Sequence, residues 1–587
     1  MSRSLRSLLG VVLVVGTAAC WRKAPPRFHQ FGIGQPEQHE SGQSLVLAQP
    51  FPDEARIDEI AQQPAPPLPK APRMRGTDAW QLRGPLPDAV TSTLATDERS
   101  RALAKVLGGG ERRVTEPMTC FARELGLFIL AFDAQPAIDL KQWIAARCGV
   151  GHAGATLALS RIGHPRARLF DIERDAPHVE AVAAKVPEAS DFGVAVVDDG
   201  DRGIAVVATV PRAVNVADVA MVPTGGEVIV RGFDDAPIGG VFGFATRGED
   251  GFSQCRPIAA EGASPNAFAL ACPIDPEDAS ASVEIAIGGP GDVLAHEVLT
   301  LWVSPRGTLS DAWTARAVAV PVSGEERGAL EWLTAINAVR ERLGLRVWSH
   351  AIAQTELVGG LLPHFIAARN DPRLQDEIAL GMLAGWKVEG TISNGDLRSV
   401  VLPRDVPFDR MVGAAMASPI FRARALAPQS ATAAIAVSDD AAARASHLVL
   451  LSYELFEPRD YTAAQEAFLD QLDAQRAARD LPPVKRVGDP ADRRVLDAAA
   501  ERVRVGERQP MDELQGLLDH FSKRAGQAMH GVVYTTLTLD GYRPDFDGPL
   551  VKERNVAVVT KIASWHPDGS AWGQHVVYVL YLIPGER

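Results

Sequence analysis

Four of the five cysteines form two local pairs, and disulfide formation is the clearest chemistry that they offer. Cys120 and Cys148 flank a stretch that is expected to form two helices, and Cys255 and Cys272 flank a short β segment. In an oxidising compartment this even number and short spacing favour Cys120–Cys148 and Cys255–Cys272, one of three possible connectivities. Each bond would stabilise the fold by roughly 3 kcal/mol. Metal binding is the alternative, although no CxxC or HExxH motif accompanies these cysteines.

The motifs of common hydrolases are absent. No G-x-S-x-G sequence supplies a nucleophilic serine. His296 and Glu297 begin a pattern typical of zinc peptidases, but Thr300 occupies the position of the second histidine ligand. We therefore predict no catalytic residue, no metal ligand and no cofactor.

The fifth cysteine, Cys20, follows the three parts of a secretory signal. Arg3 and Arg6 supply positive charge, residues 8–15 are apolar, and residues 16–19 are small. The apolar run is too short to span the roughly 30 Å of hydrocarbon in a membrane. The sequence therefore predicts export, with residues 1–19 as the signal peptide.

A cysteine directly after small residues resembles the signal of bacterial lipoproteins, in which it is acylated and becomes the mature N-terminus. Thr17 stands where this motif usually has Leu. The resemblance implies lipid attachment at Cys20 and a lipid anchor in the membrane; an ordinary cleaved signal is the alternative. Trp21, rather than Asp, follows the cysteine, and by resemblance to the enterobacterial sorting rule this implies the outer membrane.

The charge of the chain excludes one class of partner. The 587 residues carry a formal charge of −13, which becomes −15 once residues 1–19 are removed. Such a surface has no basic field that could displace counterions from phosphates, so we predict no nucleic-acid partner. Residues 20–95 are rich in Pro and Gln and have no apolar periodicity, so a disordered stalk is expected there.

The remainder contains three similar β-hairpins, each of which follows helical sequence. Apolar β-branched runs separated by Asp, Gly or other polar turns predict these hairpins. They define a first repeat at 96–212, a second at 325–457 and a third at 460–587. Between the first two, residues 213–310 contain short apolar strands separated by Gly, Pro and Asp turns, which predicts a β-sandwich.

The second repeat resembles the CAP superfamily, which comprises cysteine-rich secretory, antigen 5 and pathogenesis-related-1 proteins. The resemblance rests on the order of four features. These are the pattern Asn-x-x-Arg-x-x-x-Gly-Leu, a second helix, a short helix at Ser-Pro and a hairpin. The residues are Asn337, Arg340, Gly344, Leu345, Ser418 and Pro419. In the third repeat Asp473 replaces the Asn, and the first repeat retains only the order of helix and hairpin. The resemblance implies an α+β fold of repeated α-β-α sandwich units with an inserted all-β sandwich.

The family's metal-binding cleft is expected to be degenerate here. Phe421 stands just after the Ser-Pro step, where the family has a His, and the Gly-Glu-Asn segment expected between Leu380 and Ser399 is missing. His364 lies near the other expected His. These departures favour a membrane-tethered envelope lipoprotein that binds an envelope protein or an apolar ligand without catalysis. The alternative is an envelope hydrolase that acts on peptide or cell-wall polymer in a CAP-like cleft.

Overall fold

The protein is described by a computed structural model that divides into two compact units. The first holds the described residues of Met1–Arg22, Pro52–Leu383 and Asp396–Ser452, and the second holds those of Lys23–Phe51, Ala384–Gly395 and Tyr453–Arg587. The described residues are 20–21, 51–83, 98–108, 112–151, 158–162, 169–184, 186, 190–211, 214–222, 226–258, 266–288, 294–306, 309–321, 327–456, 461–536, 539, 546, 548–567 and 571–584. The signal predicted at 1–19 lies outside them.

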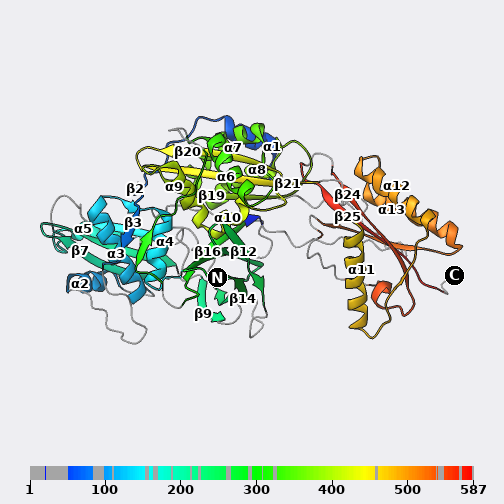
Figure 1. The fold of residues 1–587 in the computed structure, drawn as a ribbon, viewed down its shortest axis with the longest axis horizontal. Helices are drawn as coiled ribbons and strands as arrows, with labels where there is room; N and C mark the ends of the chain where they lie inside the picture. The colour runs from blue at the N-terminus through cyan, green and yellow to red at the C-terminus, as the bar shows by residue number, and fades with distance from the viewer. Residues whose placement is uncertain are drawn as a thin grey trace, which may run out of the picture. The chain divides into compact units, whose positions relative to one another are not determined.

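The three repeats contain four-stranded sheets with one common topology (Figure 1). In each sheet a two-residue first strand lies beside the third strand, which forms a hairpin with the fourth, and the second strand completes the other edge. The first sheet is β4 (Arg113–Val114), β7 (Ser190–Asp199), β8 (Arg202–Pro211) and β6 (Ala158–Ile162). The second is β18 (Ser349–His350), β20 (Thr432–Asp440), β21 (Ala445–Leu455) and β19 (Ile392–Pro403). The third is β22 (Lys485–Arg486), β24 (Ala557–Trp565), β25 (Gln574–Leu582) and β23 (His530–Thr536).

The helices also occur in a common order. A first helix precedes the two-residue strand, and two more helices separate that strand from the second one. The first helices are α2 (Glu98–Leu107), α6 (Ala329–Arg342) and α11 (Thr462–Ala477). The following pairs are α3 (Glu116–Phe132) with α4 (Ile138–Arg147), α7 (Ile352–Ala367) with α8 (Pro372–Ala384), and α12 (Pro490–Arg504) with α13 (Pro510–Ala525).

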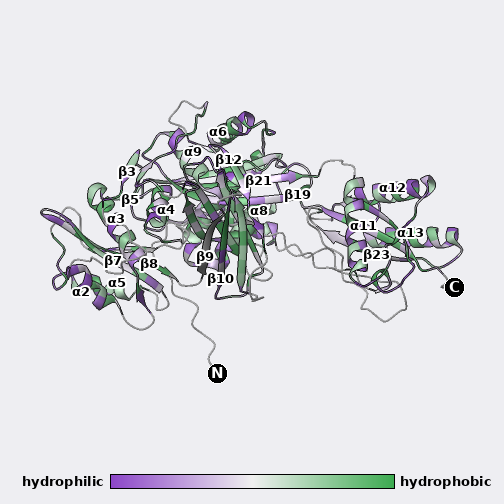
Figure 2. Cartoon of the chain, turned by 60° about the horizontal axis from the view of Figure 1, so that its bottom comes forward, coloured by the Kyte–Doolittle hydropathy of each residue, from purple (hydrophilic) through white to green (hydrophobic). Residues whose placement is uncertain are grey.

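The helices cover the sheets on both faces in the first and third repeats. In the third repeat α11 packs with alternate strand residues such as Val577 and Val579, whereas α12 and α13 pack with Val576 and Tyr578 on the other face. Figure 2 shows the corresponding stripes of polar and apolar residues along α12 and α13, as expected for helices with one buried face. The α+β class predicted from the sequence is confirmed.

A β-sandwich lies between the first two repeats. One sheet contains β13 (Arg256–Pro257), β14 (Ala267–Pro273), β10 (Glu227–Asp234) and β9 (Val214–Val222). The other contains β1 (Cys20–Trp21), β16 (Leu294–Val303), β15 (Ala281–Gly288), β11 (Gly240–Arg247) and β12 (Gly251–Gln254). The chain passes from the second sheet to the first at Cys255, which forms a disulfide with Cys272 in β14.

The prediction of a disordered stalk over 20–95 is wrong for residues 51–83. They form α1 (Glu54–Gln62), β2 (Met74–Arg75) and β3 (Ala79–Gln81), while 22–50 and 84–97 lie outside the described residues. Helix α1 packs on α7 (Figure 1), β2 pairs with β5 (Gln135–Pro136), and β3 pairs with β17 (Ala312–Thr314). The segment has few apolar residues and no periodicity, but distant parts of the chain bury the ones it has: Ile57, Ile60, Met74 and Trp80.

Truncation of Trp80 tests this correction. Its ring lies 5.1 Å from that of Phe128 and is 6% exposed. Trp80→Ala should lower the free energy of unfolding of the first compact unit by about 3–5 kcal/mol, measured by denaturant titration. The control, Leu68→Ala, changes a half-buried residue of the same segment and should have little effect. Equal stability of both variants would mean that the segment is a free stalk.

Candidate functional site

The motif that carries the family resemblance shapes a loop. Asn337 donates from its amide to the Trp348 carbonyl (3.0 Å) and accepts from the Trp348 N–H (2.8 Å). In the third repeat Asp473 accepts from the Val484 N–H at the same sequence spacing (2.8 Å). An Asp can therefore replace the Asn, because the interaction common to both repeats needs only an acceptor oxygen.

The arginine of this motif is also structural. Arg340 and Arg476 are fully buried, and each donates through Nε to the carbonyl six residues later, at 2.7 Å in both repeats. Their remaining N–H groups donate to further backbone carbonyls: Ala425, Ala427 and Ser430 for Arg340, and Leu550, Glu553 and Arg554 for Arg476. Five donors in a fixed fork suit a set of several carbonyls.

The Ser-Pro step begins a short helix that is covered by the β-sandwich. Ser418 is the N-cap of α10 (Pro419–Ala425) and accepts from the Phe421 N–H at 3.2 Å. Phe421 is fully buried in the core of the second repeat. On the outer side of the helix, Ile420 and Ala423 pack against Phe244, Ala286 and Ala295 of the sandwich. The face of α10 beside Phe421, where the CAP resemblance would imply a histidine, is therefore a contact between domains.

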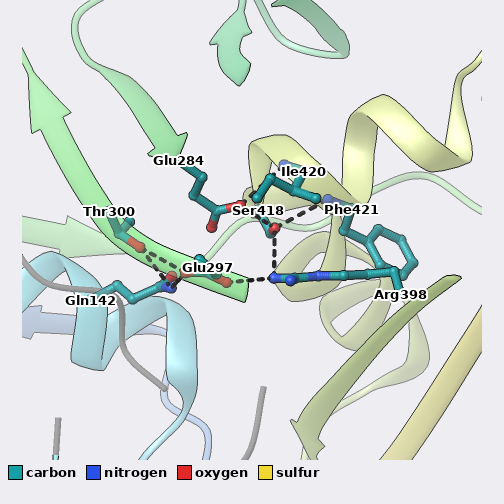
Figure 3. A network of polar contacts seen from close by, with 8 residues as sticks. All are labelled: Gln142, Glu284, Glu297, Thr300, Arg398, Ser418, Ile420 and Phe421. Atoms are coloured by element: carbon teal, nitrogen blue, oxygen red, sulfur yellow. Dashed lines mark hydrogen bonds and ion pairs between the residues drawn. The ribbon is translucent and has the colours of Figure 1, made fainter. Parts of the chain in front are cut away.

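Two carboxylates from the sandwich meet α10 and β19 at this contact (Figure 3). Glu284 Oε2 accepts from the Ser418 hydroxyl at 2.6 Å and from the Ile420 N–H at 3.0 Å. Ser418 Oγ accepts in turn from Arg398 Nη2 at 3.4 Å as well as from the Phe421 N–H. The hydroxyl proton and both acceptor sites of this serine are thus engaged.

The second carboxylate extends the network to the first repeat. Glu297 Oε2 pairs with Arg398 Nη2 at 2.8 Å. Glu297 Oε1 accepts from the Thr300 hydroxyl at 2.8 Å and from the Gln142 amide at 3.4 Å. Gln142 belongs to α4, Glu297 and Thr300 to β16, and Arg398 to β19. One polar network therefore joins the first repeat, the sandwich and the second repeat.

The network is shielded from solvent, and burial sets its electrostatics. Glu284 is 0%, Glu297 5% and Arg398 3% exposed. Burial, followed by repulsion from Glu297, raises the pKa of Glu284 to about 8, against the opposing influence of Arg398 and its hydrogen bonds. On α4 nearby, burial raises the pKa of Asp139 to about 6 and lowers that of Lys141 to about 8. At neutral pH the neutral form of Glu284 therefore predominates next to the Glu297–Arg398 pair.

The space beside these groups is too small for a substrate. A cavity of about 20 Å³ is lined by Gln142, Glu297, Arg398 and Ser418 together with apolar residues of β19 and α9 (Phe408–Ala417). This is room for about one water molecule. The arrangement can hold three domains in register.

The other predicted site residues are distributed as follows. Cys120 of α3 and Cys148 at the end of α4 form a disulfide that ties the two helices together. The side chain of Cys20 lies outside the described residues. His364 contacts the Gln63 carbonyl through Nε2 at 3.4 Å. Across the described part of the chain, no group of three or more His, Cys, Asp or Glu residues could hold a metal ion, and no helix is long and apolar enough to cross a membrane.

Glu284, Arg398 and Gln142 were not predicted from the sequence as residues of a site. A signal exists for two of them, because Glu284 and Arg398 are charged residues within strands that are otherwise almost entirely buried. Charged residues are almost never fully buried unless they are paired. Glu297 was noted only as part of a failed zinc motif; Thr300, at the missing ligand position, is in fact its hydrogen-bond donor.

Comparison with known proteins finds little. No protein-family model and no curated protein matches the sequence. Among solved structures, the chain is similar to a cysteine-rich secretory protein from Staphylococcus aureus subsp. aureus Mu50, with 10% sequence identity and a TM-score of 0.17. The match covers 41% of this chain and 86% of that protein.

The buried Glu284 makes stability depend on pH in a predictable direction. A carboxyl whose pKa rises from 4.5 unfolded to about 8 folded binds its proton more tightly in the folded state. The resulting contribution of Glu284 to the free energy of unfolding is fully present below pH 4.5 and is lost as pH rises through about 8. Between pH 5.5 and 8.5 the free energy of unfolding should fall by roughly 3 kcal/mol. Glu284→Gln should remove most of this fall, as measured by denaturant titration at both pH values.

Glu277→Gln is the matched control, because Glu277 lies in the same sandwich with its side chain 90% exposed. It should retain the pH dependence of the unsubstituted protein. If Glu284→Gln and Glu277→Gln respond to pH alike, the carboxyl of Glu284 is not held in its neutral form by the domain contact.

Proposed function

We propose that this chain is a bacterial envelope lipoprotein, anchored through Cys20 to the outer membrane, that acts by binding a protein partner and not by catalysis. The observation that most directly supports action without catalysis is that the sandwich covers one face of α10. Its residues next to Ser418 pack on the sandwich, and the polar groups gathered there lie in a network with almost no exposure. A hydrolase that used this face would have to separate the sandwich from the second repeat.

The alternative of an apolar small-molecule ligand has less support. Ligand pockets usually enclose roughly 300–1,000 Å³. An apolar cavity between α7 and β21 has only about 40 Å³ of free space. A cavity of about 480 Å³ has a lining that includes the charged residues Arg327, Arg404 and Asp439, which do not suit an apolar ligand. A protein partner needs no such cavity, because it binds to surface.

Lipid anchoring is tested at Cys20. Cys20→Ser should shift the protein from the membrane fraction to the soluble envelope fraction, or leave it uncleaved, and should abolish incorporation of labelled palmitate. The physical reason is that stable anchoring takes more than one acyl chain, and a lipoprotein cysteine supplies several. Unchanged fractionation with no label in the unsubstituted protein would refute the anchor.

The absence of catalysis is tested with the purified chain carrying Cys20→Ser. Incubation with cell-wall polymer and with peptide libraries should give turnover no greater than that of heat-denatured protein. Turnover that disappears in Ser418→Ala, while the melting temperature stays within a few degrees, would establish the hydrolase alternative.

A further inference from the structure

An apolar groove on the second repeat is covered by the chain's own N-terminal segment. Helix α7 contributes Leu362 and Phe365, and strands β19 and β21 contribute Val401 and Leu448. Residues 63–74 are here called the strap, and four of them line the groove: Pro69, Ala71, Pro72 and Met74. About 40 Å³ remains unfilled beneath. Atoms that line such a void lose dispersion contacts, so the strap does not fill the groove well.

Met74 is the only residue of the strap whose side chain is buried. Ile57 and Ile60 of α1 are buried before it, and Met74 is 2% exposed at its end. None of residues 61–73 is buried. Residues 64–72 include Pro64, Pro66, Pro67, Pro69 and Pro72 and form no helix or strand, which is typical of an extended segment that is already ordered before it binds.

The groove recognises the backbone of the strap and one apolar side chain. Arg369 Nη2 donates to the Lys70 carbonyl at 3.3 Å, and the Met74 N–H donates to the Ala443 carbonyl at 2.7 Å. The Met74 side chain packs with Val401, Ala443 and Ala445. Backbone hydrogen bonds carry no sequence information. Any extended peptide with prolines and an apolar residue at the right spacing could make the same contacts.

We propose that this groove is a docking site for an extended, proline-rich peptide segment of a partner protein, and that the strap occupies it until such a segment replaces it. This inference rests on the proposed function and names the class of partner. A lipid acyl chain is a poorer occupant, because it offers neither an N–H for the Ala443 carbonyl nor a carbonyl for Arg369. A partner residue larger than Ala71 could also fill the remaining void.

The test uses the full chain carrying Cys20→Ser, with and without Met74→Asp. An aspartate at position 74 would bury a carboxylate, which releases the end of the strap. The probe is a fluorescent peptide of residues 63–77, and fluorescence anisotropy measures its binding. The tethered strap competes at an effective concentration near millimolar. The peptide should therefore bind the Met74→Asp protein at least tenfold more tightly than the protein with Met74.

Three controls define the outcome. A peptide carrying Met74→Asp should bind neither protein, Leu68→Asp in the protein should not increase binding, and Arg369→Ala added to the Met74→Asp protein should weaken binding at least threefold. If Met74→Asp lowers the melting temperature strongly, Met74→Ala replaces it with the same expectation. No peptide binding to either protein, or equal binding of both peptides, would overturn the proposal. Such a failure would not affect the proposed function, because the fractionation, palmitate-labelling and turnover experiments test that function separately.

Discussion

The buried ion pair between Glu297 and Arg398 is the constraint on which the arrangement of the first compact unit depends. Removing two charges from water is costly, and further hydrogen bonds to the atoms of a buried pair offset part of this cost. Thr300, Gln142 and Ser418 supply such bonds from three separate parts of the chain. Loss of any one domain from the contact would leave part of this network unsatisfied. The network therefore specifies how the domains pack, whatever its net contribution to stability.

This constraint explains why repeats of similar fold make different contacts. The second and third repeats share the carbonyl-binding arginines Arg340 and Arg476, and all three share one sheet topology. In the second repeat, α10 and β19 contact the sandwich. The strap, from the N-terminal part of the chain, lies over another surface of the same repeat. The three repeats share one sheet topology, whereas the contacts with the sandwich and the strap belong to the second repeat.

Local patterns in the sequence predicted what local interactions determine. Alternating apolar residues and Asp or Gly turns identified the hairpins, and short spacing identified the two disulfide pairs that the structure contains. The strap and the buried network were missed because their partners are distant in sequence: Arg398 lies 101 residues from Glu297, and Ser418 lies 134 residues from Glu284. Nothing in the neighbourhood of Trp80 indicates that Phe128 will cover it.

The measurement that tests the account most directly is hydrogen–deuterium exchange at the amides of Ile420 and Phe421, which donate to Glu284 and Ser418. If the network locks the sandwich onto α10, both amides should exchange only through global unfolding of the first compact unit, with the same dependence on denaturant as amides of the β20 core. Exchange of both amides through a low-energy local opening that spares β20 would contradict the account, because it would show that this face opens to solvent in the folded protein.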